Sequence, residues 1–289
     1  MRKLLWIPAC LVLFFIGDRL GGTMLSNIVA ESQFRYAKLY RGQAQSDILL
    51  LGNSRGLIFY QPYIEKITGQ STFNLSYNSL PVDLGRAMVA DYFNTYEPPK
   101  LLIIDVSLCD RQNTQLIAGF NTFSSFSGNL DKLIKEKAAK SWYGGQLSHL
   151  FRYNNEVFQR TLYYWKKSDK DWLNDRVISS TMQENVKNET VYELTITDYL
   201  LEELDQLIRI AEEKGTQVEL VINPYYPAYF DRMKNFKQFI DKIETKTNRK
   251  VRDYSKILSE TTGFADYQHL NKEGSKQYLD ILQKDGVLP

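Results

Sequence analysis

The chain has 289 residues, which is enough for one sizeable α/β domain with a substantial insertion rather than for several domains. Its 36 lysines and arginines are almost balanced by 34 aspartates and glutamates. Nucleic acid is therefore not an expected partner, because a protein needs a basic excess to displace the counterions of a phosphate backbone. The two cysteines, Cys10 and Cys109, are not expected to pair, since Cys10 lies in an apolar N-terminal segment.

The N-terminal segment has the pattern of a membrane anchor. Two basic residues precede the apolar run Leu4–Gly17, and Asp18 and Arg19 separate this run from a weaker apolar stretch, Leu20–Ala30. The first run is shorter than the ~20 residues that span a bilayer, but the second extends it if the two charged side chains pair or lie near an interface. No small-x-small cleavage site follows. We expect residues 1–30 to form an uncleaved single-pass anchor, with the basic end inside and the rest of the chain outside the cytoplasm.

Beyond residues 31–45, which we expect to be a juxtamembrane linker, short apolar runs alternate with helical patterns. This rhythm predicts an α/β fold with a mostly parallel sheet and flanking helices over residues 46–289. It is interrupted at about 109–190, where we expect a largely helical insertion. The predicted strands are Ile48–Leu51, Thr72–Leu75, Leu101–Val106, Val218–Ile222 and Val251–Tyr254, and the predicted helices are Tyr63–Thr68, Val82–Tyr96, Thr197–Lys214, Phe230–Lys246 and Lys272–Leu282.

Ser54 follows the first predicted strand in a Gly-Asn-Ser turn. Loops at the carboxyl ends of parallel strands are where open α/β sheets bind and react. A strand-to-helix turn also presents backbone N–H groups that suit a developing oxyanion. The simpler interpretation is a turn with a helix N-cap, which is common.

Asp266 and His269 strengthen the interpretation of Ser54 as a nucleophile. Their spacing suits a loop in which the carboxylate binds one imidazole nitrogen while the other faces a hydroxyl. Alternatively, Asp266 or Asn271 caps the closing helix and His269 is a packing residue. That alternative explains either residue alone, but not their occurrence together with a serine at a strand end.

In this order, Gly52-Asn53-Ser54-Arg55, Phe73-Asn74-Leu75-Ser76 and Asp266-x-x-His269-Leu-Asn resemble the motifs of the SGNH/GDSL hydrolase superfamily. The resemblance is closest to its membrane-anchored branch, which includes D-alanyl-lipoteichoic acid biosynthesis proteins and polysaccharide O-acetyltransferase or acetylesterase domains. It covers roughly residues 46–106 and 197–285. It implies a three-layer α/β/α sandwich in which Ser54 is the nucleophile, His269 the base and Asp266 the residue that orients the base.

Two positions depart from that family's pattern. The family has a glycine after the second strand, whose N–H contributes to the oxyanion hole, whereas this chain has none there, so Ser79 or Asn78 would supply the N–H. The family has an asparagine after the third strand, where this chain has Asp105.

The leading hypothesis is a membrane-anchored, extracytoplasmic serine acyl-esterase or acyltransferase that acts on a cell-envelope polysaccharide or glycopolymer. A multi-pass membrane acyltransferase is a candidate partner. The alternative is a catalytically inactive SGNH-like envelope-biogenesis protein that binds a polymer or a membrane partner, which the two departures motivate.

The sequence gives less support to other candidate functional residues and sites. Cys109 and His149 are expected to be packing residues. With two histidines and no phosphate loop or dinucleotide fingerprint, we expect neither a metal site nor a cofactor. The segment 151–172, dense in aromatic and basic residues, could pack as an amphipathic helix on the sheet, line a polymer-binding groove or lie on a membrane surface.

Overall fold

A computed structural model describes residues 6–191 and 193–289. The chain folds into two compact units, each built from two stretches of sequence. One, which we call the helical unit, contains residues 1–43 and 114–169, and the other, the sheet unit, contains residues 44–113 and 170–289. The N-terminal helix therefore belongs to the same compact unit as most of the predicted insertion.

The sheet unit is built on five parallel strands in the order β2-β1-β3-β4-β5. Strand β1 pairs on both sides, with Ile48 opposite Thr72 of β2 and opposite Leu101 of β3. All four residues of β1 are buried, as expected for a continuous apolar run covered on both faces of a parallel sheet. The predicted α/β class with a parallel sheet is confirmed. The strands are β1 (Ile48–Leu51), β2 (Thr72–Asn74), β3 (Leu101–Asp105), β4 (Gln217–Ile222) and β5 (Val251–Asp253).

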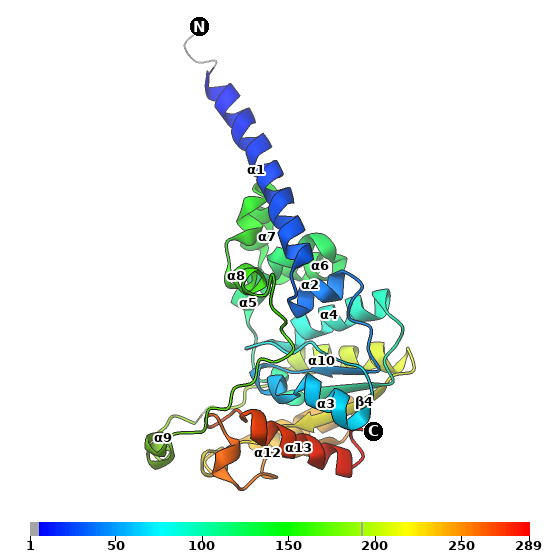
Figure 1. Cartoon of the computed structure of the whole chain (residues 1–289), viewed down its shortest axis with the longest axis vertical. Coiled ribbons are helices and arrows are strands. Elements are labelled where there is room, and N and C mark those ends of the chain that lie inside the picture. Colours follow the sequence, from blue (N-terminus) through cyan, green and yellow to red (C-terminus); the bar gives the residue numbers. More distant parts are fainter. Residues whose placement is uncertain (1–5, 192) are drawn as a thin grey trace. The chain divides into compact units, whose positions relative to one another are not determined.

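Helices lie on both sides of this sheet. Figure 1 shows α4 (Val82–Thr95) and α10 (Asp198–Glu212) on one side and α13 (Lys272–Lys284) on the other. The face of α10 that carries Leu200, Leu204, Leu207, Ile208 and Ala211 is buried, as its 3.6-residue spacing predicts. The remaining helices of this unit are α3 (Gln61–Thr68), α9 (Ser180–Asn185), α11 (Pro227–Phe230) and α12 (Phe236–Thr247), with short 3-10 turns η2 (Ser54–Ile58), η3 (Val106–Cys109) and η6 (Thr261–Gly263).

The predicted helix Phe230–Lys246 is wrong in its first turn. The chain forms the short helix α11, leaves helical geometry, and begins α12 only at Phe236. Asn235, which precedes α12, bonds across to both backbone groups of Leu194 instead of capping the helix with its side chain. A tertiary contact therefore determines where this helix begins, and the local pattern could not reveal it.

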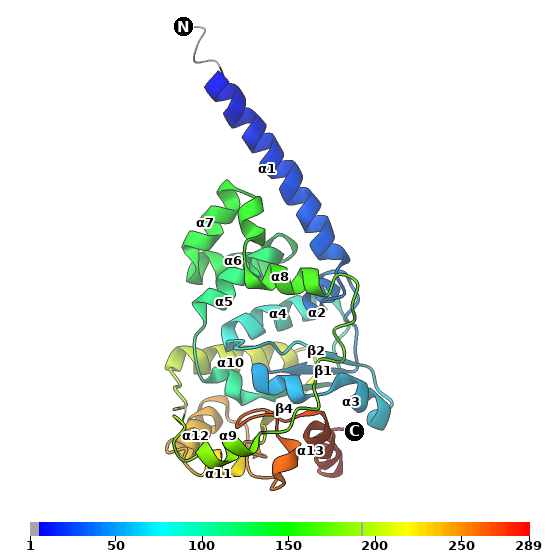
Figure 2. The ribbon, with the colours of Figure 1, turned by 60° about the vertical axis from the view of Figure 1, so that its left-hand side comes forward.

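The helical unit begins with α1 (Trp6–Glu31), which among the described residues is the one helix long and apolar enough to cross a membrane. Figure 2 shows α1 as one long helix. The core of the helical unit is aromatic, with Phe34, Tyr36, Phe120 and Phe123 almost fully buried. The other elements are α2 (Arg35–Tyr40), α5 (Thr114–Gly119), η4 (Phe120–Phe126), α6 (Gly128–Lys137), α7 (Ala139–Leu147), η5 (Leu150–Tyr153) and α8 (Glu156–Tyr163).

A buried ion pair connects the two sequence stretches of the helical unit. Asp169 accepts hydrogen bonds from the backbone N–H of Arg35 at 2.8 Å and from its Nε at 3.0 Å. Both side chains are at most 7% exposed. Removing either partner would leave an uncompensated buried charge, so this pair fixes α2 against the end of the 114–169 stretch.

Candidate active site

Ser54 lies directly after β1, at the start of the 3-10 turn η2. The side chain of Asn53, not that of Ser54, caps this turn, because its Oδ1 accepts the N–H of Arg55 at 2.9 Å. The simple N-cap interpretation therefore applies to Asn53. The hydroxyl of Ser54 is left to bond elsewhere.

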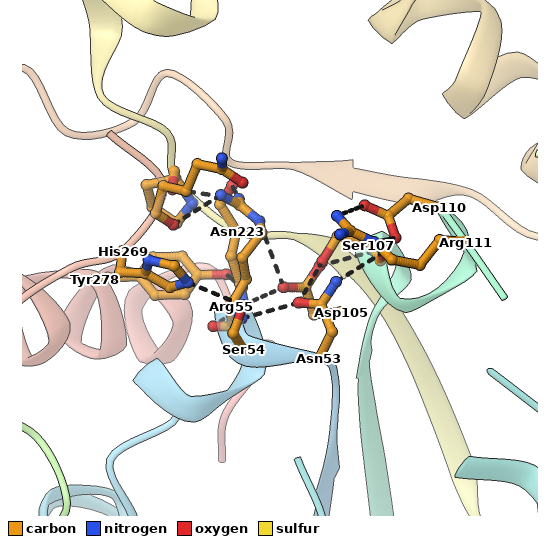
Figure 3. A network of polar contacts seen from close by, with 12 residues as sticks. Asn53, Ser54, Arg55, Asp105, Ser107, Asp110, Arg111, Asn223, His269 and Tyr278 are labelled. Atoms are coloured by element: carbon orange, nitrogen blue, oxygen red, sulfur yellow. Dashed lines mark hydrogen bonds and ion pairs between the residues drawn. The ribbon is translucent and has the colours of Figure 1, made fainter. Parts of the chain in front are cut away.

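It bonds to His269. Nε2 of His269 is 2.9 Å from the Ser54 Oγ, across 215 residues of sequence, while Nδ1 is 2.9 Å and 3.0 Å from the two carboxylate oxygens of Asp266. The structure therefore brings together the three residues that the sequence nominated. Figure 3 shows the imidazole of His269 facing Ser54.

The loop that carries the acid and the base is held by its own backbone. Asp266 Oδ1 accepts the N–H groups of Gln268 at 2.8 Å and His269 at 3.0 Å. Where the loop passes the start of α13, a Cβ on Gly274 would lie 2.0 Å from the carbonyl oxygen of Gly263. Only glycine fits at that approach, so the site depends on a residue without a side chain.

These contacts set the pKa of Asp266. Burial alone would raise this pKa. The hydrogen bond from His269, the positive charge of His269 when it is protonated, and the two backbone N–H groups outweigh burial and hold the pKa of Asp266 below its ordinary value. An ionised carboxylate only accepts hydrogen bonds, so Nδ1 of His269 donates to Asp266, and in the neutral imidazole Nε2 then presents its lone pair to Ser54. This is the state that a general base requires.

A pocket of about 220 Å³ opens on Ser54 and His269. One wall comes from the segment 172–176, where Trp172 Nε1 donates to the carbonyl of Leu57 at 2.6 Å. Besides His269 and its partner Asp266, the charged side chain of the lining is Arg176. The lining residues are Ser54, Leu57, Ile58, Asn78, Trp172, Leu173, Asn174, Arg176, Ala265, Asp266, His269 and Leu270.

The two predicted oxyanion residues are placed differently. Asn78 lines the pocket with Ser54, whereas Ser79 is not among the lining residues. Ser79 instead has a positive φ of 56°, a left-handed conformation that glycine adopts more easily. Its carbonyl accepts the side chain of Asn113 at 3.1 Å. Asn78 is therefore the better placed of the two to stabilise an oxyanion, and this role stays a prediction.

Asp105, which stands where the resembling family has asparagine, points into the protein. It is fully buried, accepts the N–H of Ser107 at 3.0 Å and accepts Nδ2 of Asn223 at 2.7 Å. Burial raises the pKa of this carboxyl, and the nearby guanidinium of Arg55 opposes the rise. Asp105 is not among the residues that line the pocket with Ser54, so it is not placed to donate a hydrogen bond to an oxyanion there.

Arg55 is the residue of this candidate site whose contacts the sequence did not reveal. Its side chain is 3% exposed and lies over the ring of Tyr225, with 3.4 Å between guanidinium carbon and ring centre. Nη1 donates to the carbonyl of Gln268 at 2.9 Å, and Nη2 donates to the carbonyls of Asn223 and Pro224. Arg55 therefore ties the residue after the serine to the end of β4 and to the residue before the histidine (Figure 3).

The network continues to α13, where Tyr278 donates to Oδ1 of Asn223 at 2.7 Å. Asn223 also donates to the carbonyl of Arg55 at 3.1 Å. A sequence signal for this network existed: Asn53 and Asn223 stand just after predicted strands and Asp105 near the end of one, so all three lie at the carboxyl edge of a parallel sheet.

The remaining candidates lie outside this site. Cys109 is fully buried, and burial raises the pKa of its thiol well above the ordinary value, which disfavours the thiolate that a nucleophile needs. His149 belongs to the helical unit. Among residues 6–191 and 193–289, no group of three or more histidine, cysteine, aspartate or glutamate side chains is placed to hold a metal ion.

The segment 151–172 does not form a single helix on the sheet. Residues up to Asp169 belong to the helical unit, where Tyr164 stacks on Phe34 at 5.6 Å, and Trp172 belongs to the pocket wall. The expectation of an amphipathic helix on the sheet is wrong, because α8 packs on α1, α5 and η4 within its own unit.

No protein-family model matches this sequence, and a search of curated proteins found no match either.

Proposed function

We propose that this protein is a serine acyl-esterase or acyltransferase, anchored to a membrane by α1, whose sheet unit acts outside the cytoplasm on a cell-envelope polysaccharide or glycopolymer. The observation that carries the proposal is the hydrogen-bonded line from Ser54 Oγ through His269 to Asp266, open to a pocket. The motif order that resembles SGNH/GDSL hydrolases supports the same reaction class.

In the first half-reaction, Ser54 Oγ attacks the carbonyl carbon of an ester and its proton passes to Nε2 of His269. Asp266 stabilises the imidazolium that forms. The backbone N–H of Ser54, together with Asn78, would face the oxyanion. The C–O bond to the alcohol then breaks, the leaving oxygen takes the proton from Nε2, and the acyl group remains on Ser54 as an ester.

In the second half-reaction, Nε2 removes a proton from an acceptor, whose oxygen attacks the acyl-serine carbonyl. Water as acceptor gives hydrolysis, and a sugar hydroxyl gives transfer. The bond to Ser54 Oγ breaks and the proton returns to that oxygen, which restores the starting state. If transfer is the physiological reaction, a multi-pass membrane acyltransferase is the candidate partner that would supply acyl groups.

The pocket also bears on the substrate. Arg176 lines it beside Asn78 and Asn174, while the carboxylate of Asp266 is already engaged by His269. A cationic side chain without an opposing free carboxylate favours substrates that carry negative charge close to the ester. An acidic glycopolymer fits this preference.

The test uses the full-length protein in detergent with a chromogenic acetyl ester and with a fluorophosphonate that reacts covalently with activated serines. We expect the wild type to hydrolyse the ester and to be labelled once, and the Ser54→Ala variant to lose both properties. Ser259→Ala, an exposed serine of the same unit, is the matched control and should behave as wild type.

Equal background hydrolysis by the wild type and Ser54→Ala, with no labelling of either, would refute the enzymatic proposal. The alternative, a non-catalytic envelope-biogenesis protein that binds a polymer or a membrane partner, would then be favoured. Full complementation of a deletion strain by Ser54→Ala would support that alternative independently of the choice of ester.

A further inference from the structure

Two charged residues, Asp18 and Arg19, stand in the middle of the long helix α1, and both form hydrogen bonds with residues 146–150 of the helical unit. Asp18, although only 3% exposed, accepts hydrogen bonds from the Ser148 hydroxyl at 2.5 Å and from the N–H groups of His149 at 2.8 Å and Leu150 at 3.2 Å. Arg19 donates to the carbonyls of Gln146 at 3.3 Å and Leu147 at 3.4 Å.

These bonds attach one corner of the helical unit to α1. Arg19 meets the carbonyl end of α7 and Asp18 meets the N–H groups that start η5, so each charge lies where the helix ends favour it. We call residues 143–151 the α7–η5 corner. A Cβ on Gly22 would lie 2.3 Å from the Cβ of His149, so glycine is required for this close approach.

The position of the corner along α1 matters for a membrane. The apolar run before Asp18, Leu4–Gly17, has 14 residues, which would span about 21 Å if all of it is helical. A bilayer core is about 30 Å thick. A spanning α1 must therefore use residues beyond Asp18, and the corner bonded to Asp18 then lies at the depth of the membrane rather than above it.

The surface of the corner suits that depth. Four large apolar side chains point outward: Tyr143 is 62% exposed, Leu147 82%, Leu150 40% and Phe151 46%. They continue the exposed apolar surface of α1, where Leu20 is 68% and Met24 65% exposed beyond Asp18. Four backbone groups of this corner, the N–H groups of His149 and Leu150 and the carbonyls of Gln146 and Leu147, bond to Asp18 and Arg19 rather than to water, as a lipid environment demands.

We propose that the α7–η5 corner is a second membrane-contacting element, which enters the boundary between headgroups and acyl chains beside α1. The helical unit is then held by a transmembrane helix together with an interfacial wedge. Tyr143 and Phe151 supply the aromatic side chains typical of that boundary. The occupant of this surface is lipid, and the inference is independent of any reaction at Ser54.

The test measures the depth of single labelled positions in the full-length chain. In a Cys10→Ser background, which leaves only the fully buried Cys109, Leu147→Cys is labelled with an environment-sensitive NBD dye and the protein is reconstituted in phosphatidylglycerol and phosphatidylcholine vesicles. Because Leu147 is 82% exposed, the change does not disturb the core. Lys237→Cys, an exposed position on α12, is the control.

We expect blue-shifted NBD emission at position 147 that spin-labelled lipids quench, and water-like, unquenched emission at position 237. Water-like emission at both positions would overturn the proposal. So would a blue shift at 147 that resists lipid quenching and disappears as the lipid-to-protein ratio rises, because that result indicates contact with a second copy. The Ser54→Ala variant should give the same depth profile as its parent.

Discussion

Of the 19 large apolar side chains that are exposed among the described residues, 17 belong to the helical unit and only Val177 and Ile257 belong to the sheet unit. The charges divide as well. The sequence of the helical unit holds 14 basic against 6 acidic residues, a net charge of +8, and that of the sheet unit holds 22 against 28, a net charge of −6. The near neutrality of the whole chain conceals a strong internal asymmetry.

The interiors of the two units differ less than their surfaces. Both bury apolar side chains and both enclose a charged pair, Arg35 with Asp169 in one and Arg55 with Asp105 in the other. What separates them is the solvent that each surface suits. A basic, apolar surface is suited to lipid, whereas an acidic and polar one is suited to water. The changes described next should therefore act on one unit and leave the other unaffected.

The largest expected effect is that of Asp266→Asn in the sheet unit. An asparagine amide would donate to Nδ1 of His269 and favour the tautomer in which Nε2 carries the proton. We expect kcat for ester hydrolysis to fall about 10⁴-fold, with membrane association in a vesicle flotation assay unchanged. A loss smaller than tenfold would mean that Asp266 does not orient the base.

The next effect concerns Arg55→Met, which leaves Asp105 buried without its cation. We expect the free energy of unfolding to fall by about 3–5 kcal/mol. The double variant Arg55→Met/Asp105→Asn should regain part of this stability, because no charge remains buried and the amide oxygen of the new side chain still accepts one of the two hydrogen bonds that Asp105 accepts. It should not regain activity, since the bond from Arg55 to the carbonyl of Gln268 is still missing.

This double variant separates stability from positioning. Its measurements are chemical denaturation and the separate values of kcat and KM. If recovery of stability also restored kcat to the wild-type value, Arg55 would be structural only and would have no part in placing His269.

In the helical unit, Asp18→Ala removes the acceptor of three hydrogen bonds at the α7–η5 corner. Unsatisfied donors in apolar surroundings cost about 1–3 kcal/mol each. We expect faster hydrogen exchange at His149 and Leu150 and an unchanged kcat in the sheet unit. Ser148→Ala, which loses only one of these bonds, is the graded control. An effect on kcat as large as the effect on exchange would show that the two units are coupled.

The smallest effect is expected from Arg176→Gln at the pocket. Loss of one exposed charge should raise KM for a negatively charged ester about tenfold, equivalent to about 1.4 kcal/mol, and should leave KM for a neutral ester of similar size unchanged. Parallel changes for both esters would indicate a general distortion of the pocket. Lys256→Gln, a surface lysine paired with Asp231, serves as the charge-matched control.

Much of the sheet could be predicted because its strands are short, wholly apolar runs between turns. Ile48–Leu51 was located to the residue. Ser54, Asp266 and His269 could be nominated for a related reason, since their residue types and local spacing carry recognisable chemistry. Their distances could not be predicted. The 2.9 Å between His269 and Ser54 depends on how two loops 215 residues apart are packed.

Arg55 and Asp18 were harder to interpret because an isolated charge has the same appearance in sequence whether it is solvated or paired. Arg55 reaches Asn223 across 168 residues, and Asp18 reaches Ser148 across 130. Neither partner lies within a window in which periodicity or capping rules operate. The same limit explains why the first helix could not be assigned to a unit with residues 114–169.

By itself, the sequence determined the elements of this protein: a parallel α/β sheet, an apolar N-terminal helix, and a serine, an aspartate and a histidine whose order along the chain resembles that of the SGNH/GDSL motifs. These follow from local patterns of hydrophobicity and from short motifs. Only the tertiary structure decided that Ser54, His269 and Asp266 are hydrogen-bonded in series, that Asp105 points inward, and that α1 belongs to one helical unit with residues 114–169. Those outcomes depend on contacts between distant residues, which packing creates and local sequence does not encode.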